Sequence, residues 1–466
     1  MLRLDKVERK AIWDELGRIL EDYTTAVGTL PVTPELNPEK IRALLAPCDF
    51  LHPMDALDAL RLAASGLQNY QVHTPHPRYF GLFNPAPSTM GIAADALVAG
   101  FNPQLAAWSH SPFAVEVEQH LVRALGSHFG YSARVVDGVF ASGGMEANHT
   151  AILAALTNRF PEFATKGLRA LQAQPVFYCS SESHHSFLKA ARLCGLGMDS
   201  MRHVEVDSQL RMNPKALQMG IERDTANNFA PFLIVGTAGT TNAGIIDPLS
   251  ALADIASKHH VWYHVDAAWG GGVAFVPELQ LLLNGIERAD SITFDAHKWL
   301  SVPMGAGLFL TRHNTILDQT FRVATAYMPK DAAGLDIVDP HLHSMQWSRR
   351  FIGLKVFLSL LAAGWEGYAD AIRHQIKMGD VLREGLKQAG WHIANETPLP
   401  VVCFAKPGAT AAEHERIVSK IVRSGKAWIS TTLLAGDRTV LRACVTNFRT
   451  QESDVAALIR DLSESG

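Results

Sequence analysis

The sequence has few cysteines, no long apolar run and no clear excess of either charge. Its five cysteines among 466 residues are scattered and never form a C-x-x-C pair, which argues against a disulfide framework or a zinc site. No run reaches the roughly 18 apolar residues that a membrane-spanning helix needs. The first ten residues also lack the apolar core of a secretory signal. We therefore expect a reduced, cytoplasmic protein with no metal and no membrane partner.

The charge balance excludes a second group of functions. Lys and Arg number 42 and Asp and Glu number 46, which gives a net charge of −4. There is no long run of one sign, so nucleic acid is not expected as a partner. A hydrophobic content of 47% with 19% charged residues is typical of a globular enzyme with a large core.

Three segments differ in their residue pattern, and the length also predicts two or three structural units. Residues 1–78 show apolar positions at helical spacing and predict a helical N-terminal segment that packs on the main domain or on a second subunit. Residues 79–350 alternate short apolar strands with helices, which predicts an α/β domain with a mostly parallel sheet covered on both faces. Residues 351–466 begin with a long helix and continue as a smaller α+β domain.

The expected strands place polar side chains at one edge of this sheet. We expect strands at 176–180, 232–236, 261–265, 291–294 and 307–311, and helices at 145–159, 186–195 and 248–258. Ligands bind at the carboxyl ends of such parallel strands. Thr241, Asp266 and Lys298 all follow or end an expected strand, so we expect them to meet there.

The run Phe294-Asp295-Ala296-His297-Lys298-Trp299-Leu300 is the most informative part of the sequence. A single lysine behind a strand is usually a solvated loop residue. Here Asp266 ends another apolar strand thirty-two residues upstream. A lysine amine that forms a Schiff base and an acid that keeps a pyridine nitrogen protonated are what pyridoxal phosphate chemistry requires.

Two further motifs fit a phosphorylated, planar cofactor. Gly143 and Gly144 open a helix, where backbone N–H groups can approach a phosphate. No Gly-Lys-Ser/Thr follows them, so the P-loop pattern is absent. The pair His184-His185 follows an expected strand. An imidazole there could stack on a ring, lie on the surface or bind a metal, and the last is disfavoured because adjacent histidines rarely ligate one ion.

Together these residues resemble the group II pyridoxal-phosphate-dependent amino acid decarboxylases. This family includes aromatic-L-amino-acid, glutamate, cysteine-sulfinate and diaminobutyrate decarboxylases. The similarity runs from His76-Pro77-Arg78-Tyr79-Phe80 to Leu441-Arg442-Ala443-Cys444-Val445, with the motifs in the family's order. The resemblance implies a fold-type I architecture, pyridoxal 5'-phosphate as cofactor and an amino acid as substrate.

The resemblance also implies roles for individual residues. Lys298 matches the Schiff-base lysine, Asp266 the partner of the pyridine nitrogen, and His185 the histidine that stacks on the ring. Thr241 and Ala268 match residues that flank the cofactor. The positions where the family binds the phosphate correspond to Gly144, Met145 and His297. Met145 stands where serine is frequent, so only its backbone N–H could serve there.

Two matches concern the substrate and the reaction. Arg442 matches an arginine associated with the substrate α-carboxylate. Tyr327 matches the tyrosine of a mobile loop, here 322–345, whose closure excludes water and delivers a proton to Cα after CO₂ has left. Phenylalanine at this place would imply oxidative conversion to an aldehyde, so Tyr327 favours simple decarboxylation. Because relatives share pocket residues across subunits, a homodimer is implied.

The cues to the substrate side chain conflict. Leu82 and Phe83 offer apolar surface and Gly81 leaves room, which suits an aromatic side chain. Gln104, however, is polar where aromatic-selective relatives are bulkier, and Trp269-Gly270-Gly271-Gly272 resembles the branch with acidic substrates. Aromatic amino acids are the favoured substrates, and an acidic amino acid of the glutamate, aspartate or cysteine-sulfinate type is the alternative.

Two other classes of protein share part of this pattern. A carbon–carbon aldehyde lyase shares the fold and the lysine, but should lack Tyr327 and usually carries a membrane anchor. A cofactor-free scaffold is disfavoured by the intact set Lys298, Asp266 and His185.

Overall fold

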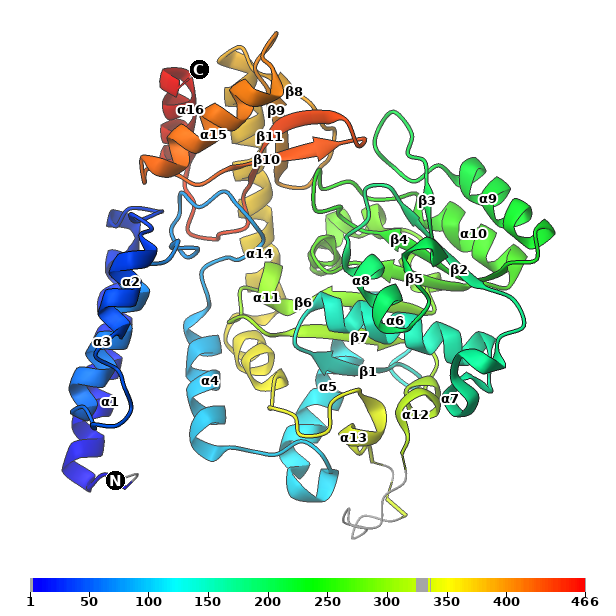
Figure 1. Ribbon diagram of the computed structural model, residues 1–466, viewed down its shortest axis with the longest axis horizontal. Helices are drawn as coiled ribbons and strands as arrows, with labels where there is room; N and C mark the ends of the chain where they lie inside the picture. Colours follow the sequence, from blue (N-terminus) through cyan, green and yellow to red (C-terminus); the bar gives the residue numbers. More distant parts are fainter. Residues whose placement is uncertain (1–2, 324–333, 336, 466) are drawn as a thin grey trace.

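The structure is a computed structural model that describes residues 3–323, 334–335 and 337–465. A seven-stranded sheet forms the centre of its larger part (Figure 1). The strands are β1 (Asp137–Ala141), β2 (Pro175–Ser180), β3 (Met201–Val204), β4 (Ala230–Thr237), β5 (Trp262–Asp266), β6 (Ser291–Asp295) and β7 (Gly307–Thr311). Their order is β1-β7-β6-β5-β4-β2-β3, and β7 alone runs antiparallel to its two neighbours.

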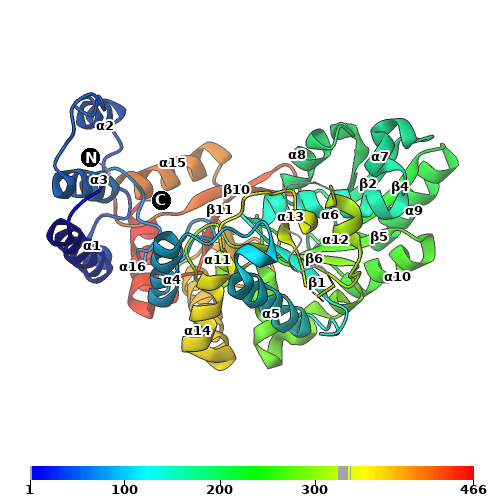
Figure 2. The same cartoon turned by 90° about the horizontal axis from the view of Figure 1, so that it is seen from below.

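Helices cover both faces of this sheet (Figure 2). One face packs on α6 (Gly144–Arg159) and α8 (Ser186–Leu193), and the other packs on α5 (Pro112–His128), α9 (Pro214–Ala226) and α10 (Leu249–His259). Successive strand residues point to opposite faces. On β4, for example, Ile234 joins one core cluster while Leu233 and Val235 join the other. A strand buried on both faces needs the continuous apolar sequence seen here.

The C-terminal part contains a second, antiparallel sheet. Its strands are β8 (His392–Ile393), β9 (Val401–Ala405), β10 (Ser430–Leu434) and β11 (Arg438–Cys444), in the order β10-β11-β9-β8. They pack with α15 (Ala411–Arg423) and α16 (Glu452–Ser465). The long helix α14 (Gly353–Gln388) leads into this part and is interrupted at Gly364, where φ is 64°.

One short N-terminal stretch joins the C-terminal sheet. Tyr79 forms a parallel bridge with Trp428, and the Phe80 N–H donates to the Trp428 carbonyl at 2.9 Å. Phe80 is fully buried in the same core cluster as β9 and β11. Tyr79 and Phe80 are therefore held by the C-terminal part.

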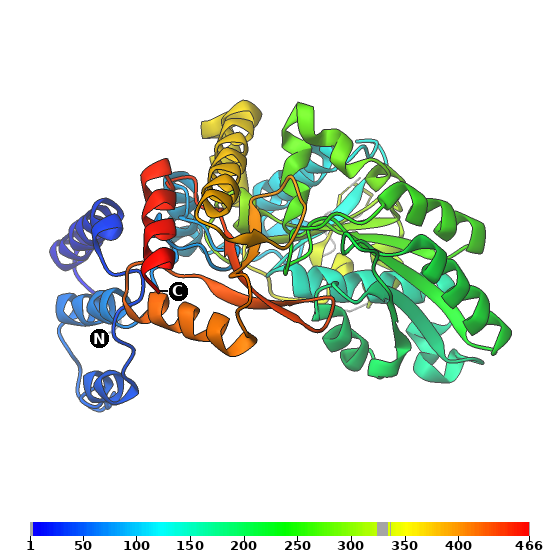
Figure 3. The same ribbon diagram turned by 90° about the horizontal axis from the view of Figure 1, so that it is seen from above.

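The N-terminal helices lie at one end of the molecule, apart from the large sheet (Figures 1 and 3). They are α1 (Lys6–Ala26), α2 (Pro38–Leu45) and α3 (Ala56–Asn69), followed by α4 (Thr89–Phe101) beside α14. A capping box between Asp5 and Glu8 starts α1. None of the residues of α1, α2 or α3 is buried. In the described part of the chain, no helix is long and apolar enough to cross a membrane.

The remaining elements are short. The α-helices among them are α7 (Phe163–Lys166), α11 (Ala296–Trp299), α12 (Ile316–Phe321) and α13 (Pro340–His343). The 3₁₀ turns are Val27–Thr29, Trp108–His110, Gly167–Ala170, Met198–Ser200, Gly270–Phe275, Pro277–Leu283 and Ile286–Arg288.

Candidate active site

A cavity of about 260 Å³ lies at the carboxyl ends of β4, β5 and β6. Seven residues that the sequence singled out line it: Gly144, Met145, Thr241, Asp266, Ala268, His297 and Lys298. Other lining residues with polar side chains include Asn148 and Asp295, which had no predicted role, and His184 of the predicted histidine pair. The strands bring these side chains together because parallel strands end at the same edge of a sheet.

Lys298 faces the cavity beside a buried carboxylate. Its Nζ lies 3.1 Å from Oδ2 of Asp295, and the side chains are 22% and 2% exposed. The second oxygen of Asp295 has no hydrogen-bond partner. Gly144 and Gly307 make room for this carboxylate, since a Cβ on either glycine would lie within 2.9 Å of its oxygens. Asp295 therefore holds the Lys298 amine in place, and its Oδ1 can still accept a hydrogen bond.

Asp266 ends β5, and both of its carboxylate oxygens accept hydrogen bonds. Oδ1 accepts from the Ala268 N–H at 3.1 Å, and Oδ2 accepts from the Asn148 side chain at 2.9 Å. Asp266 is 6% exposed. A buried carboxylate held by two donors keeps a fixed direction, and here it lines the cavity.

The opposite wall of the cavity is formed by the start of α6 and by His297. Helix α6 begins at Gly144 without a side-chain cap, so the first N–H groups are available to an anion. The Ala306 N–H donates to Nδ1 of His297 at 3.2 Å, which leaves the proton on Nε2. Burial lowers the pKa of His297, although Asp295 acts in the opposite direction. A neutral His297 thus offers one N–H donor.

The two adjacent histidines differ in position. His184 lines the cavity, whereas His185, at the start of α8, is not among the lining residues; both are solvent-exposed by surface area. Burial lowers the pKa of His184. The charge of Asp266 acts to raise this pKa, and the charge of Lys298 acts to lower it. The resemblance gave the stacking position to His185, but of the two imidazoles only that of His184 lines the cavity.

Arg442 lies on β11 and reaches the large domain. Its Nε donates to the Thr241 carbonyl at 2.9 Å, and Nη1 donates to the Gly81 carbonyl at 2.7 Å. The guanidinium is 5.1 Å from the ring centroid of Phe83, which is also 5.6 Å from Lys298 Nζ. Arg442 is 3% exposed and its Nη2 has no partner. A buried cation with an unused donor suits a carboxylate.

Leu82 and Phe83, which were predicted to contact the substrate side chain, differ in exposure. Phe83 is buried and stacks on Trp269 with ring centroids 4.4 Å apart, while Leu82 is 49% exposed. The space that Gly81 was expected to leave for substrate is filled, because a Cβ there would lie 2.3 Å from Trp428 and 2.6 Å from Tyr79. That interpretation of Gly81 was wrong: close packing requires the glycine.

The glycine run after Trp269 also has a packing explanation. A Cβ on Gly270 would lie 2.3 Å from the Ala238 carbonyl, and one on Gly272 would lie 2.5 Å from the Trp299 ring. Trp269 itself stacks on Trp299 with ring centroids 5.0 Å apart. The run therefore does not by itself indicate the substrate.

The structure does not describe the residue predicted to be the proton donor. Tyr327 lies outside the described residues, as do residues 324–333 and 336 of the predicted loop 322–345.

The described residues also bear on metal binding. Within the described residues, no group of three or more His, Cys, Asp or Glu side chains could hold a metal ion.

The fold and the cavity together define a class of protein. A lysine and a carboxylate that line one cavity at the carboxyl edge of a mostly parallel sheet are characteristic of fold-type I pyridoxal phosphate enzymes. The conserved domain described as "Pyridoxal-dependent decarboxylase conserved domain" matches residues 38–406. The chain therefore belongs to the pyridoxal-dependent decarboxylase family.

Relatives of two substrate types match the chain. It is 28% identical over 468 residues to the aromatic-L-amino-acid decarboxylase of Bacillus atrophaeus, with 98% of this chain and 95% of that protein covered. It is 33% identical over 406 residues to the cysteine sulfinic acid decarboxylase of Mus musculus, with 86% and 82% covered. The crystal structure of mouse CSAD superposes with a TM-score of 0.93 at 27% identity and covers 99% of each chain.

The protein is thus an amino acid decarboxylase that uses pyridoxal 5'-phosphate. The cavity fits this cofactor on its own evidence, because it combines an amine, a fixed carboxylate and an uncapped helix start. The family match favours a decarboxylase over the carbon–carbon lyase.

Proposed function

We propose that the protein decarboxylates an aromatic L-amino acid to the amine and CO₂ in the cavity of Lys298. The observation that carries the proposal is the shared cavity of Lys298 and Asp266. Lys298 would bind the cofactor covalently, and Asp266 would be the partner of its pyridine nitrogen. When bound, the cofactor supplies a sink for the electron pair that the departing carboxylate leaves behind.

The other residues of the cavity bind and orient. His184 would stack on the cofactor ring, with Thr241 and Ala268 beside it. The N–H groups of Gly144 and Met145 and the Nε2–H of His297 would hold the phosphate. The uncapped start of α6 and the N–H donor of His297 both suit an anion.

Arg442 orients the substrate through its α-carboxylate. Its buried, unused Nη2 supports this role. Tyr327 then delivers the proton to Cα, and closure of the loop 322–345 excludes water. Because closure protects the reacting carbon from oxygen, the product is the amine and not the aldehyde.

The lining of the cavity favours an aromatic side chain. Trp269 lines the cavity, and Phe83, which is not among the lining residues, stacks behind it with its ring centroid 5.6 Å from Lys298 Nζ. Among the lining residues, Lys298 is the only lysine or arginine, and burial lowers the pKa of both His184 and His297. An acidic side chain would therefore find no second lysine or arginine among these lining residues. Cysteine sulfinate or another acidic amino acid is the second candidate, favoured by the mouse relative.

We also propose that the protein is a cytoplasmic homodimer. Each subunit would consist of three parts with boundaries near residues 78 and 350. All five cysteines are free, which is typical of a reducing compartment. Exposed apolar side chains on the N-terminal helices support a role of residues 1–78 in the dimer interface.

The proposal is tested by incubating the holoenzyme with aromatic amino acids, glutamate, aspartate and cysteine sulfinate while CO₂, amine, aldehyde and peroxide are measured. We expect CO₂ and amine in equal amounts from an aromatic substrate. Lys298→Ala should abolish turnover and the borohydride-sensitive visible absorption, and Tyr327→Phe should shift the product to aldehyde and ammonia. Activity retained by Lys298→Ala would overturn the assignment, and turnover of cysteine sulfinate alone would select the second candidate.

A further inference from the structure

Asp266 is the last member of a line of buried polar side chains that runs along the face of the large sheet covered by α6. Next to it is Asn148 on α6, followed by His264 on β5, Ser291 on β6 and Trp262 on β5. The four are between 0% and 4% exposed. The consecutive contacts measure 2.9 Å, 3.3 Å, 2.8 Å and 2.9 Å from Asp266 outward. Such a buried polar line among apolar side chains needs every member to be satisfied.

The carboxylate end fixes how Asn148 is oriented. Its amide nitrogen lies 2.9 Å from Oδ2 of Asp266 and 2.9 Å from Oγ of Ser186. A carboxylate only accepts, so the NH₂ group of Asn148 must face it. The amide oxygen then faces Nε2 of His264 at 3.3 Å. That nitrogen must carry a hydrogen, which it shares between Asn148 and the Thr293 hydroxyl, also at 3.3 Å.

The far end continues the line in the same direction. The Trp262 indole can only donate, and it donates to the Ser291 hydroxyl oxygen at 2.9 Å. The Ser291 hydrogen is then free to go to Nδ1 of His264 at 2.8 Å. Because the Asn148 end places the proton on Nε2, Nδ1 is the acceptor in this contact. Complete burial also lowers the pKa of His264 to about 4, which keeps the ring neutral at physiological pH.

We infer that this line is a one-way chain of donors that fixes the Asp266 carboxylate toward the cofactor's pyridine nitrogen. Every hydrogen bond in it points from Trp262 toward Asp266, so the carboxylate receives a donor and has no acceptor behind it. Asn148 is the positioning residue that touches Asp266, and His264 acts through it. The inference rests on the proposed role of Asp266.

The arrangement has a chemical consequence at the cofactor. Hydrogen bonds donated to a carboxylate stabilise its negative charge. A fixed negative charge beside the pyridine nitrogen favours the protonated ring, which is the better electron sink. A reversed chain would instead place a lone pair of Asn148 against Asp266. The direction of the chain thus sets the electronic state of a cofactor that the distant Trp262 never contacts.

The test uses apoenzyme reconstituted with pyridoxal phosphate labelled with ¹⁵N at the pyridine nitrogen. In the wild type we expect the ¹⁵N resonance of a protonated nitrogen. Asn148→Leu should move it toward the unprotonated position, weaken cofactor binding about tenfold, and lower kcat more than it changes KM. Trp262→Phe keeps an aromatic ring but removes the N–H, and should move the resonance in the same direction by less.

Matched variants make the outcome decisive. Asn158→Leu changes an exposed asparagine on the same helix and should leave the resonance unchanged. If Asp266→Asn moves the resonance but Asn148→Leu and Trp262→Phe do not, the chain is overturned while the role of Asp266 stands. If Asp266→Asn itself has no effect, the proposed role of Asp266 fails first. Should Asn148→Leu not fold, Trp262→Phe carries the test.

Discussion

Adjacent side chains in this protein have different roles because of the direction in which the backbone presents them. His184 and His185 follow the same strand, yet only His184 lines the cavity with Asp266 and Lys298. Lys298 and Asp295 form the converse case, since three residues of separation bring their charges within 3.1 Å. At this scale, chemistry depends on orientation that the residue type alone does not reveal.

The histidine pair supplies its own matched control. His184→Ala should lower kcat at least tenfold and weaken cofactor binding, because the ring loses its stacking partner; a stacked aromatic pair contributes about 1 kcal/mol. His185→Ala should leave both within about twofold of wild type. The measurements are steady-state kinetics and a fluorescence titration of apoenzyme with cofactor. Equal effects of the two substitutions would contradict the assignment of stacking to His184.

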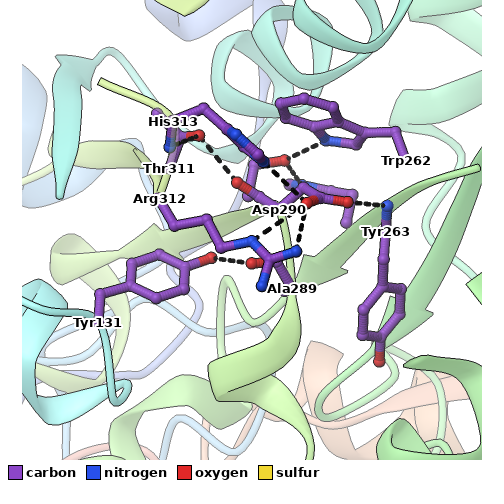
Figure 4. A network of polar contacts seen from close by, with 10 residues as sticks. Tyr131, Trp262, Tyr263, Ala289, Asp290, Thr311, Arg312 and His313 are labelled. Carbon is purple, nitrogen blue, oxygen red and sulfur yellow. Dashed lines mark hydrogen bonds and ion pairs between the residues drawn. The ribbon is translucent and has the colours of Figure 1, made fainter. Parts of the chain in front are cut away.

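At the scale of elements, a cluster around Asp290 connects β5, β6 and β7 near the edge of the sheet opposite the cavity (Figure 4). One carboxylate oxygen accepts from Arg312 at 2.8 Å and from His313 at 2.8 Å. The other accepts from the Tyr263 backbone N–H at 2.8 Å. The Asp290 carbonyl also accepts from the Thr311 hydroxyl at 2.8 Å. One side chain therefore fixes the starts of two strands and the end of a third.

Asp290→Asn should lower the free energy of unfolding by about 2 kcal/mol. The amide cannot accept from all of these donors, and its NH₂ group would face another donor. Asp254→Asn is the control, because Asp254 and its partner Arg288 are 71% and 40% exposed and such pairs contribute about 0.5 kcal/mol. Chemical denaturation of holoenzyme at a fixed concentration measures both. Similar losses of unfolding free energy in the two variants would show that the Asp290 cluster stabilises the fold no more than an exposed ion pair does.

The same cluster predicts a dependence of stability on pH. Burial alone would raise the pKa of Asp290, but hydrogen bonds from His313 and the Tyr263 N–H and the charge of Arg312 lower it below 3.8. The folded protein thus binds this proton less readily than the unfolded chain. The stabilisation is present at neutral pH and is lost as the pH falls below about 3.8 through the lower folded-state pKa. The free energy of unfolding of Asp290→Asn, measured by chemical denaturation at several pH values, should therefore fall less steeply toward acidic pH than that of the wild type.

At the scale of the whole molecule, the N-terminal helices leave apolar surface uncovered. Val7 is 77% exposed and Trp13 is 63% exposed on α1, and Leu67 is 60% exposed on α3. These helices lie beyond the C-terminal part and away from the large sheet (Figure 3). Exposed apolar side chains of this size on neighbouring helices favour a protein interface. A second copy of this chain is the partner that we propose.

Sedimentation velocity should therefore show a dimer at micromolar concentration. Trp13→Glu with Leu67→Glu should shift the protein toward the monomer, because two charges would be buried without partners. Leu281→Glu is the control, since Leu281 is 84% exposed in a 3₁₀ turn of the large domain. A wild-type monomer, or a double variant that remains as dimeric as the control, would refute the proposed interface.

The sequence determined the fold class and most of the cavity. Five of the seven strands of the large sheet follow directly from apolar runs, because a doubly buried strand must be apolar throughout. The order of strand ends then brings Thr241, Asp266 and Lys298 to one edge. β1 and β3 were not among the expected strands: β1 begins with Asp137 and Gly138, and β3 has only four residues, two of them partly or fully exposed.

Only the tertiary structure decided which side chains contact Thr241, Asp266 and Lys298. Asn148 and Asp266 are 118 residues apart, so no local pattern could pair them. Gly81 could be understood only when Trp428 was placed against it. The physical reason is general to the molecule: strand periodicity is local and is written in sequence, whereas side-chain direction and contact between distant segments are set by packing.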